Sequence, residues 1–265
     1  MDIGLRDARA FVLASSSGIG QAVATELARE GAQVVISSRD EERLAAAAAS
    51  IREATDCATD AVEYVVCDLD DPESVESGTE AAIEALGGLD VLVTNHGGPS
   101  TAPLPELSLA DFDDAYQGIL RSTMGACEAA LPALRDGGGA ITHLVAVSVM
   151  EPDARSAVCN VFRPAIYGLS KTLAEEYGAD GVRSNCVGPK GIASDRIDEK
   201  LRERAEREGI TEDEALARRV ADLPVDDLGS PETFGKVAAF VSSPAADYVT
   251  GSHVPVDGGW HRHAF

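Results

Sequence analysis

Two side chains that can move a proton, Tyr167 and Lys171, stand four residues apart in the segment 167–171. The stretch 165–176 has the apolar period of a helix, and a spacing of four places both side chains on one face of it. An ammonium group beside a phenol stabilises the phenolate form, which makes the phenol a usable proton donor and acceptor near neutral pH. The pair therefore predicts an acid–base centre.

A glycine-bearing loop near the N-terminus joins a short apolar segment to a helical one. Its residues are Ala14, Ser15, Ser16, Ser17, Gly18, Ile19 and Gly20. Backbone N–H groups at a helix start can bind a pyrophosphate, small residues allow close approach, and Gly20 lets the helix pack on the strand. The loop predicts a dinucleotide site, although the pattern alone also fits an ordinary strand-to-helix turn.

Arg39 follows the second apolar segment and bears on which dinucleotide is bound. At this position of a dinucleotide fold, a carboxylate binds the ribose 2′-hydroxyl and a cation binds a 2′-phosphate. Asp40 comes one place too late for the carboxylate. Arg39, helped by Ser16, therefore favours NADP(H) over NAD(H); the alternative is a hydrated arginine at a helix start.

Three more cofactor contacts are predicted where the third and fourth apolar segments end. Asp68 can accept a hydrogen bond from an adenine amino group, or it can cap a helix that begins near Pro72. Asn95 can bridge neighbouring strands, and Gly97 leaves room for a ribose. His96, between them, is expected to be a partly exposed loop residue.

Apolar β-branched segments alternate with amphipathic ones along the whole chain. We expect strands at 10–14, 33–37, 61–67, 91–95, 140–147, 183–187 and 253–256, and helices at 19–29, 39–54, 72–86, 111–134, 165–177 and 231–242. Strands that are apolar on both faces belong to a parallel sheet covered by helices on both sides. The sequence predicts one α/β domain of the doubly wound, Rossmann type spanning residues 1–265.

A charged helical stretch at about 195–228 interrupts this alternation. It follows the sixth strand, and the carboxyl ends of parallel strands face any bound ligand. Two readings stay open: a lid over the substrate, or a surface helical hairpin without a function.

The composition excludes several classes of partner. The chain of 265 residues has 45 acidic and 22 basic side chains and a net charge of −23. Nucleic acid and anionic membranes need the opposite charge, so neither is expected as a partner. A dispersed acidic surface with few lysines is typical of a halophile with a salt-rich cytoplasm; an ordinary acidic protein is the alternative.

The five cysteines form no C-x-x-C pair, and no histidine cluster has metal-ligand spacing. No apolar run has the length of a membrane span. We therefore expect a cytoplasmic protein with reduced thiols and no metal.

Taken in order, these motifs resemble the classical short-chain dehydrogenase/reductase family from end to end. The resemblance rests on the glycine loop, Asp68, Asn95 to Gly97, Tyr167-x-x-x-Lys171 and the C-terminal segment 248–259. It is closest to the branch of 3-oxoacyl-thioester reductases and glucose-dehydrogenase-like enzymes.

The resemblance implies NADP(H)-dependent hydride transfer between nicotinamide and a small-molecule carbonyl or secondary alcohol. Tyr167 would be the general acid or base, and Lys171 would assist it and hold the nicotinamide ribose. Pro189 and Ile192, after the sixth strand, would contact the cofactor. The family also implies a homo-oligomer, a tetramer or dimer.

Two of the family's four catalytic residues are missing. The usual serine falls on Ala146, and the usual relay asparagine falls on Ile119. Ser148 would share a face of an extended strand with Ala146, so we expect Ser148 to replace the serine. These losses keep a second function open, a non-catalytic dinucleotide-binding sensor or scaffold. A third is an isomerase or dehydratase that retains its cofactor.

Smaller departures lie around the predicted site. Ala14 stands where the first glycine of the loop is usual, and we expect it to keep a negative φ. Lys190 follows Pro189 in place of a glycine and would either contact the cofactor or point to solvent. Asn160 and Arg163 would contact the pocket or cap the next helix, with capping favoured.

Overall fold

The computed structural model describes residues 2–58, 61–99, 102–152 and 154–262. Within them, parallel strands form one sheet in the order β3-β2-β1-β4-β5-β6-β7. The strands are β1 Arg9–Val12, β2 Gln33–Ser38, β3 Val62–Val66, β4 Val91–Thr94, β5 Gly139–Leu144, β6 Val182–Pro189 and β7 His253–Val256. The strand order reverses between β1 and β4, which is where such a sheet binds ligands beyond the carboxyl ends of its strands. The predicted doubly wound α/β fold is confirmed.

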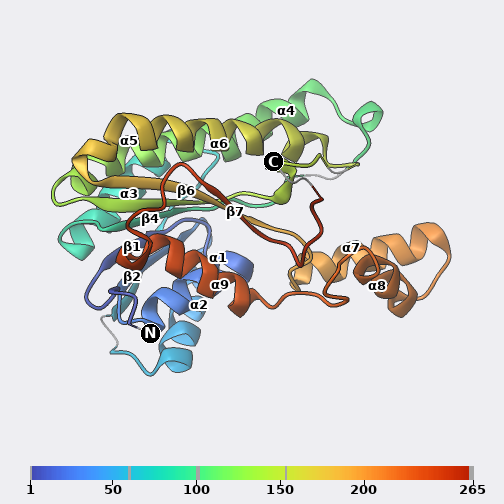
Figure 1. Ribbon diagram of the computed structural model, residues 1–265, viewed down its shortest axis with the longest axis horizontal. Coiled ribbons are helices and arrows are strands. Elements are labelled where there is room, and N and C mark those ends of the chain that lie inside the picture. The colour runs from blue at the N-terminus through green and yellow to red at the C-terminus, as the bar shows by residue number, and fades with distance from the viewer. Residues whose placement is uncertain (1, 59–60, 100–101, 153, 263–265) are drawn as a thin grey trace.

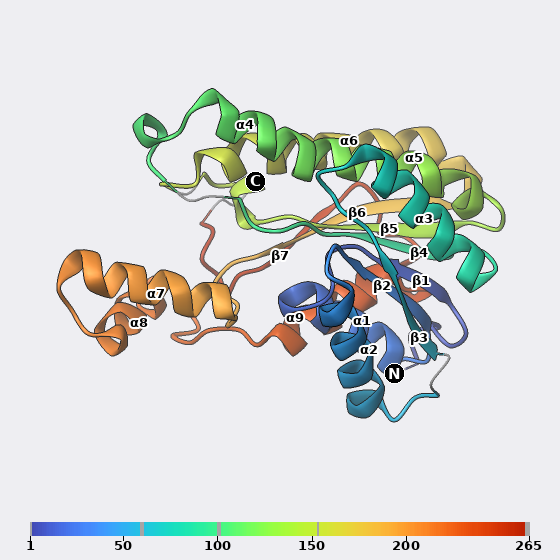
Figure 2. The ribbon, with the colours of Figure 1, turned by 180° about the vertical axis from the view of Figure 1, so that it is seen from behind.

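Helices cover both faces of the sheet. They are α1 Gly18–Arg29, α2 Glu41–Thr55, α3 Pro72–Leu86, α4 Leu109–Ala115, α5 Ser122–Arg135, α6 Ala157–Tyr177, α7 Asp195–Glu208, α8 Glu212–Val220 and α9 Pro231–Ser242. Helices α1, α2 and α9 lie on one face, and α3, α5 and α6 lie on the other (Figure 1). Figure 2 shows the same three layers from behind. Each face buries its own apolar core, which fixes the sheet between the two helical layers.

The helix predicted over 111–134 is interrupted. A π-helical turn, Tyr116–Arg121, separates α4 from α5. The Ser122 hydroxyl donates to the Gly118 carbonyl at 2.8 Å, and the Thr123 hydroxyl donates to the Ile119 carbonyl at 2.7 Å. Hydroxyl groups that bond the carbonyl four residues back compete with the regular helical ladder. Such turns recur at functional sites, and this one includes Ile119, where the relay asparagine is missing.

Helix α6 begins at Ala157, so the start predicted at 165 is wrong. The prediction placed the start after Pro164, which lacks an N–H for the helical ladder. One missing donor does not end this helix. Val158, Phe162 and Ile166, four residues apart, are buried along one stripe, and their burial stabilises the added turns.

The interrupting stretch after β6 folds as two helices, α7 and α8, which extend away from the layered body (Figure 1). They pack on each other through Leu201, Ala205 and Ala215. Thr211 and Glu214 form a capping box that starts α8. This small core of their own holds the two helices together. The role of α7 and α8 as a lid stays a prediction.

Candidate active site and cofactor crevice

Tyr167 and Lys171 lie together on α6, as the sequence predicts. The Lys171 Nζ atom is 5.5 Å from the centre of the Tyr167 ring. The tyrosine is partly buried against the apolar cluster beneath α6, while the lysine is exposed. Gly251 lies beside the lysine stem, since a Cβ there would be 3.4 Å from Lys171 Cδ. The ring is thus fixed by packing, and the ammonium group is held near it.

A buried chain of hydrogen bonds ties α6 to three strands. Thr94 Oγ1 and His143 Nδ1 are 2.8 Å apart, His143 Nε2 and Ser184 Oγ are 3.2 Å apart, and Ser184 Oγ and Ser170 Oγ are 3.0 Å apart. Burial lowers the pKa of His143 to about 3, so the ring is neutral at neutral pH and can accept as well as donate. Ser170 precedes Lys171, so this network joins the part of α6 that carries Tyr167 and Lys171 to the sheet. Sequence reasoning did not single out His143.

Arg163 fastens the start of α6 to the end of β5. Its guanidinium is buried and donates from Nη1 to the Leu144 carbonyl at 2.6 Å. The favoured prediction, that Asn160 and Arg163 cap the helix, is wrong, because the N-cap position is Ser156. Helix α6 begins earlier than expected, and both residues therefore lie inside it.

Ser148 does not continue the strand that should carry it. Strand β5 ends at Leu144, Ala146 is extended, and residues Val147–Val149 form a 3₁₀ turn. The alternation that would place Ser148 on the same face as Ala146 therefore fails. The Ser148 Oγ atom is buried and has no hydrogen-bond partner among the described residues. Its catalytic role stays a prediction without the strand geometry that suggested it.

The glycine loop opens α1 as predicted. Residues Ser16 and Ser17 precede Gly18, the first residue of the helix. The Ser17 side chain makes no capping bond, and the first turn holds no acidic residue. The N–H groups at the start of α1 therefore keep their capacity for an anionic ligand.

Gly20 and Asn95 shape the wall of this crevice. A Cβ on Gly20 would lie 2.6 Å from the Ala14 carbonyl oxygen and 2.7 Å from Asn95 Nδ2. The Asn95 amide donates to that carbonyl at 2.9 Å, which joins the end of β4 to the loop after β1. Gly97 is exposed, with open space where a Cβ would stand. These contacts fit a dinucleotide whose pyrophosphate lies on the helix start and whose ribose passes Gly97.

Ala14 has a positive φ of 47°, so the prediction of a negative φ is wrong. The loop still makes the tight turn that a glycine makes in this fold, and the alanine carries the steric cost of it. Sequence reasoning expected a negative φ at Ala14, whereas the turn between β1 and α1 imposes a positive one.

Replacing Ala14 by glycine is therefore expected to stabilise the protein. The left-handed conformation costs an L-residue about 1–2 kcal/mol, and glycine gives back about 0.5–1 kcal/mol as unfolded-state entropy. The net gain of about 0.5–1 kcal/mol should raise Tm by roughly 2 °C. The control is Ala49→Gly at an exposed site within α2, which should lower Tm because the alanine there is helical. Equal losses of Tm in both variants would contradict the assignment of strain to Ala14.

Arg39 and Asp68, which are predicted to contact the adenosine half of a dinucleotide, follow the ends of β2 and β3. The Arg39 side chain is 74% exposed and faces Asp70, with Nη1 and Oδ2 3.7 Å apart. An exposed pair at this distance binds weakly, so Arg39 is available to a phosphate. Asp68 accepts from the Asp70 N–H at 3.1 Å, and the N-cap of α3 is Asp71, so the alternative of Asp68 as that cap is wrong.

The other residues at the carboxyl ends of the strands differ in exposure. His96 is buried, with 6% of its surface exposed, so the prediction of a partly exposed loop residue is wrong. Pro189 closes β6, and Ile192 is buried and bridges to Gly229. The Lys190 side chain does not extend into solvent, because its Nζ lies 4.0 Å from the centre of the Trp260 ring.

A hollow of about 230 Å³ lies between the loop after β6, the α7–α8 unit and the C-terminal segment. Lys190, Arg204, Arg219 and Asp222 line it, with the Trp260 ring. It adjoins the predicted cofactor residues Pro189 and Ile192 in the chain.

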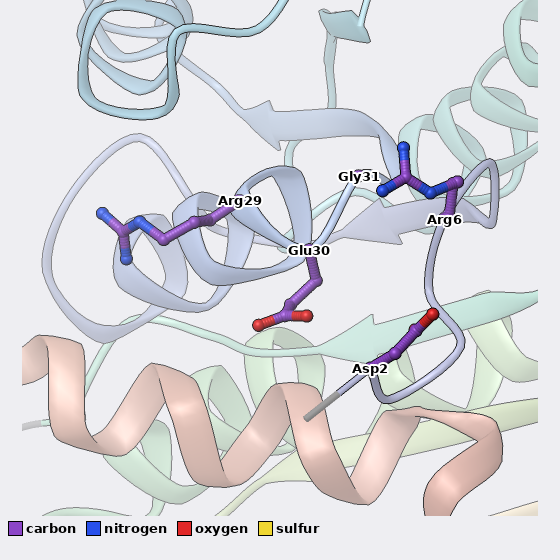
Figure 3. Close-up of a pocket in the computed structure, with 5 residues that line it drawn as sticks. All are labelled: Asp2, Arg6, Arg29, Glu30 and Gly31. Carbon is purple, nitrogen blue, oxygen red and sulfur yellow. The ribbon is translucent and has the colours of Figure 1, made fainter.

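A second hollow, of about 290 Å³, lies at the opposite end of α1 from the glycine loop. Figure 3 shows its charged side chains, Asp2, Arg6, Arg29 and Glu30, which do not converge on one point. None of them belongs to the predicted site.

Neither a metal centre nor a membrane span emerges from the described ranges. In the part of the chain that the structure describes, no three His, Cys, Asp or Glu side chains are placed to hold a metal ion. Among the helices of the same ranges, none is long and apolar enough to cross a membrane.

His253 lies beside Tyr167 of the predicted acid–base pair, and sequence reasoning did not single it out. Its ring centre is 6.1 Å from that of Tyr167, and the two rings meet edge to face at 60°. It begins β7, which lies at the edge of the sheet beside β6. The sequence signal was weak, because a single histidine in a short strand 86 positions after Tyr167 gives no indication of contact.

Comparisons with known proteins agree with this arrangement. A family model described as enoyl-(acyl carrier protein) reductase matches residues 13–261. Dehydrogenase/reductase SDR family member 4 of Oryctolagus cuniculus is 30% identical over 252 residues, which cover 94% of this chain and 92% of that protein.

Two solved structures match almost the whole chain. L-Sorbose reductase of Gluconobacter frateurii, complexed with NADPH and L-sorbose, is 30% identical with a TM-score of 0.93, covering 99% of this chain and 100% of that one. An NADPH-bound short-chain oxidoreductase of Pseudomonas aeruginosa, described as containing an atypical catalytic center, is 30% identical with a TM-score of 0.86, covering 98% and 100%. By sequence and by structure, this chain belongs to the short-chain dehydrogenase/reductase family, a family of oxidoreductases.

Proposed function

We propose that this protein is an NADP(H)-dependent oxidoreductase that interconverts a small carbonyl compound and a secondary alcohol. The observation that carries the proposal is the Tyr167–Lys171 pair, with Nζ 5.5 Å from the ring centre, in a chain whose glycine loop opens α1. A phenol beside an ammonium group is a proton donor for a carbonyl oxygen. The NADPH in two similar reductase structures supports the choice of cofactor.

The residues divide the work as follows. The N–H groups at the start of α1 would bind the pyrophosphate, and Arg39 would bind the 2′-phosphate. Asn95 and Gly97 would form the wall of the crevice beside a ribose. Bound NADPH would supply the hydride that reduces the carbonyl carbon. Tyr167 would give its proton to the carbonyl oxygen, and Lys171 would stabilise the phenolate that remains.

The test is oxidation of NADPH, followed by the loss of absorbance at 340 nm, with a panel of ketones, ketoses and 3-oxoacyl thioesters. L-Sorbose belongs in the panel because a similar protein is its reductase. The assay is run at low and at molar KCl, since a net charge of −23 favours salt for stability. Turnover of any panel member with formation of the matching alcohol supports the proposal.

Two other outcomes would replace the proposed function. Tight binding of NADPH without turnover of any panel member would favour the sensor or scaffold, which the losses at Ala146 and Ile119 keep open. Conversion of a substrate without net consumption of NADPH would favour an isomerase or dehydratase.

The assembly and location stay proposals. Ala126 and Ala130 of α5 are buried in the subunit's own core, so they serve packing within one chain. Met124 of α5 and Val161 of α6 are about half exposed, at 48% and 52%. These apolar side chains on neighbouring helices support a homo-oligomer, a dimer or tetramer. The net charge of −23 supports a salt-rich cytoplasm.

A further inference from the structure

The acid–base centre lacks a second group to hold the reacting oxygen. Position 146, where a hydroxyl would stand, carries an alanine that is partly exposed at the end of β5. The nearest hydroxyl in the chain, Ser148, is buried inside a 3₁₀ turn. A carbonyl oxygen that receives only the Tyr167 proton gains less stabilisation than one that also accepts a preorganised hydrogen bond.

The imidazole of His253 lies near position 146. Its Nε2 atom is buried and has no hydrogen-bond partner among the described residues. A buried polar atom without a partner costs free energy, which a ligand oxygen can offset. The residue as a whole is only partly buried, and its ring lies edge to face with the ring of Tyr167.

Gly188 shows that the ring extends across β6 toward the end of β5. A Cβ on Gly188 would be 2.3 Å from His253 Nε2 and 2.9 Å from the Ala146 carbonyl carbon. Gly188 does not have a positive φ, so its backbone conformation does not require glycine. The glycine is required by space: it leaves the volume beside Ala146 that the imidazole occupies.

The charge of the ring follows from its surroundings. Burial lowers the pKa of His253, the nearby His261 lowers it further, and Asp257 acts in the opposite direction. Tyr167 faces the ring from α6. The imidazole is therefore neutral at neutral pH, with one nitrogen that donates and one that accepts.

We propose that His253, acting through Nε2–H, donates a hydrogen bond to the carbonyl oxygen of the substrate in place of the absent serine hydroxyl. The inference rests on the proposed function. In reduction, the hydride from NADPH forms the new C–H bond, the C=O π electrons move to oxygen, and the Tyr167 proton completes the alcohol. The imidazole keeps its proton throughout and stabilises the negative charge that develops on oxygen.

The first experiment compares three variants with the wild type in the NADPH assay, using the best carbonyl of the panel. His253→Leu should lower kcat by about 100-fold, the usual loss of one such donor, with the Kd for NADPH within twofold of wild type. His253→Gln keeps a side-chain N–H and should retain activity within about tenfold. Ala146→Ser should restore most of the activity when combined with His253→Leu, because it returns a hydroxyl to the vacant position.

The second experiment needs no substrate. Gly188→Ala should lower Tm by several degrees in the wild-type background, because the new methyl group collides with Nε2. In the background of His253→Ala the drop should be clearly smaller, since the ring is gone and the contact with the Ala146 backbone remains. Equal drops in both backgrounds would contradict the placement of the ring.

The outcomes separate two failures. A wild-type protein that turns over no carbonyl contradicts the proposed function, and the Tm comparison then still reports whether His253 occupies the space beside Ala146. An active wild type whose rate His253→Leu leaves unchanged contradicts the role of His253 alone. If His253→Gln is as impaired as His253→Leu, the effect comes from packing, and the role of His253 as a donor is contradicted. The same role is contradicted if Ala146→Ser does not restore activity to the His253→Leu variant.

Discussion

Tyr167→Phe is expected to lower kcat for carbonyl reduction by roughly 1000-fold, within the range that loss of a general acid produces. Phenylalanine retains the ring that packs on the apolar cluster beneath α6, so the fold and the Tm should change little. The Kd for NADPH should stay within about threefold, because the start of α1 and Arg39 are untouched. Stopped-flow and steady-state kinetics with NADPH, beside fluorescence titration of the cofactor, measure both quantities.

The matched control is Tyr177→Phe on the same helix. Tyr177 is the last residue of α6, and the Arg135 guanidinium carbon lies 5.6 Å from the centre of the Tyr177 ring. Its kcat should equal that of the wild type. A Tyr167→Phe protein that retains wild-type turnover would remove the acid–base role and, with it, the observation that carries the proposed function.

Arg39→Asp should reverse the preference between NADP and NAD. The variant loses the cation that would bind the 2′-phosphate and places a carboxylate beside Asp70, already 3.7 Å from the wild-type guanidinium. A charge-assisted hydrogen bond contributes about 1.5–3 kcal/mol, so the ratio of kcat/KM for NADPH to that for NADH should fall by at least about 100-fold once repulsion is added. The new carboxylate can accept from the ribose hydroxyls of NADH, so activity with NADH should hold or rise.

Arg43→Asp is the control for the charge change. Arg43 is an exposed residue in the first turn of α2, the helix that follows Arg39, and it pairs with Asp40 at 3.4 Å. Arg43→Asp alters the net charge by the same amount as Arg39→Asp. It should leave the ratio of kcat/KM for NADPH to that for NADH within about threefold of the wild type. If both variants shift the ratio equally, the preference comes from the general field of the protein and not from a contact of Arg39.

The elements near the N-terminus could be predicted closely from the sequence, because the patterns that indicate them are local. β1, the glycine loop and α1 follow from an apolar run, small residues and an amphipathic period, which act within a few positions. The break between α4 and α5 has another cause. Gly118 approaches the Asp70 carboxylate just before α3, since a Cβ there would be 2.5 Å from Oδ1, and Gly118 lies in the π-helical turn. No local pattern records such an approach.

The candidate site divides in the same way. Tyr167 and Lys171 could be paired because four residues of one helix fix their relation. Ser148 could not be placed, because β5 ends sooner than its apolar composition suggests and a 3₁₀ turn rotates the side chain away from the strand face. The positive φ of Ala14 is set by the turn between β1 and α1, and not by the preference of alanine.

The sequence by itself determined the doubly wound sheet, the cofactor loop and the helical Tyr167–Lys171 pair, because each depends on the period or spacing of residues close together in the chain. Only the tertiary structure decided what surrounds that pair. The buried network from Thr94 to Ser170 joins three strands to α6, and His253 reaches Tyr167 because β7 pairs with β6 at the edge of the sheet. Such contacts join residues tens of positions apart, and their geometry is fixed by packing of the whole core, which no local pattern encodes.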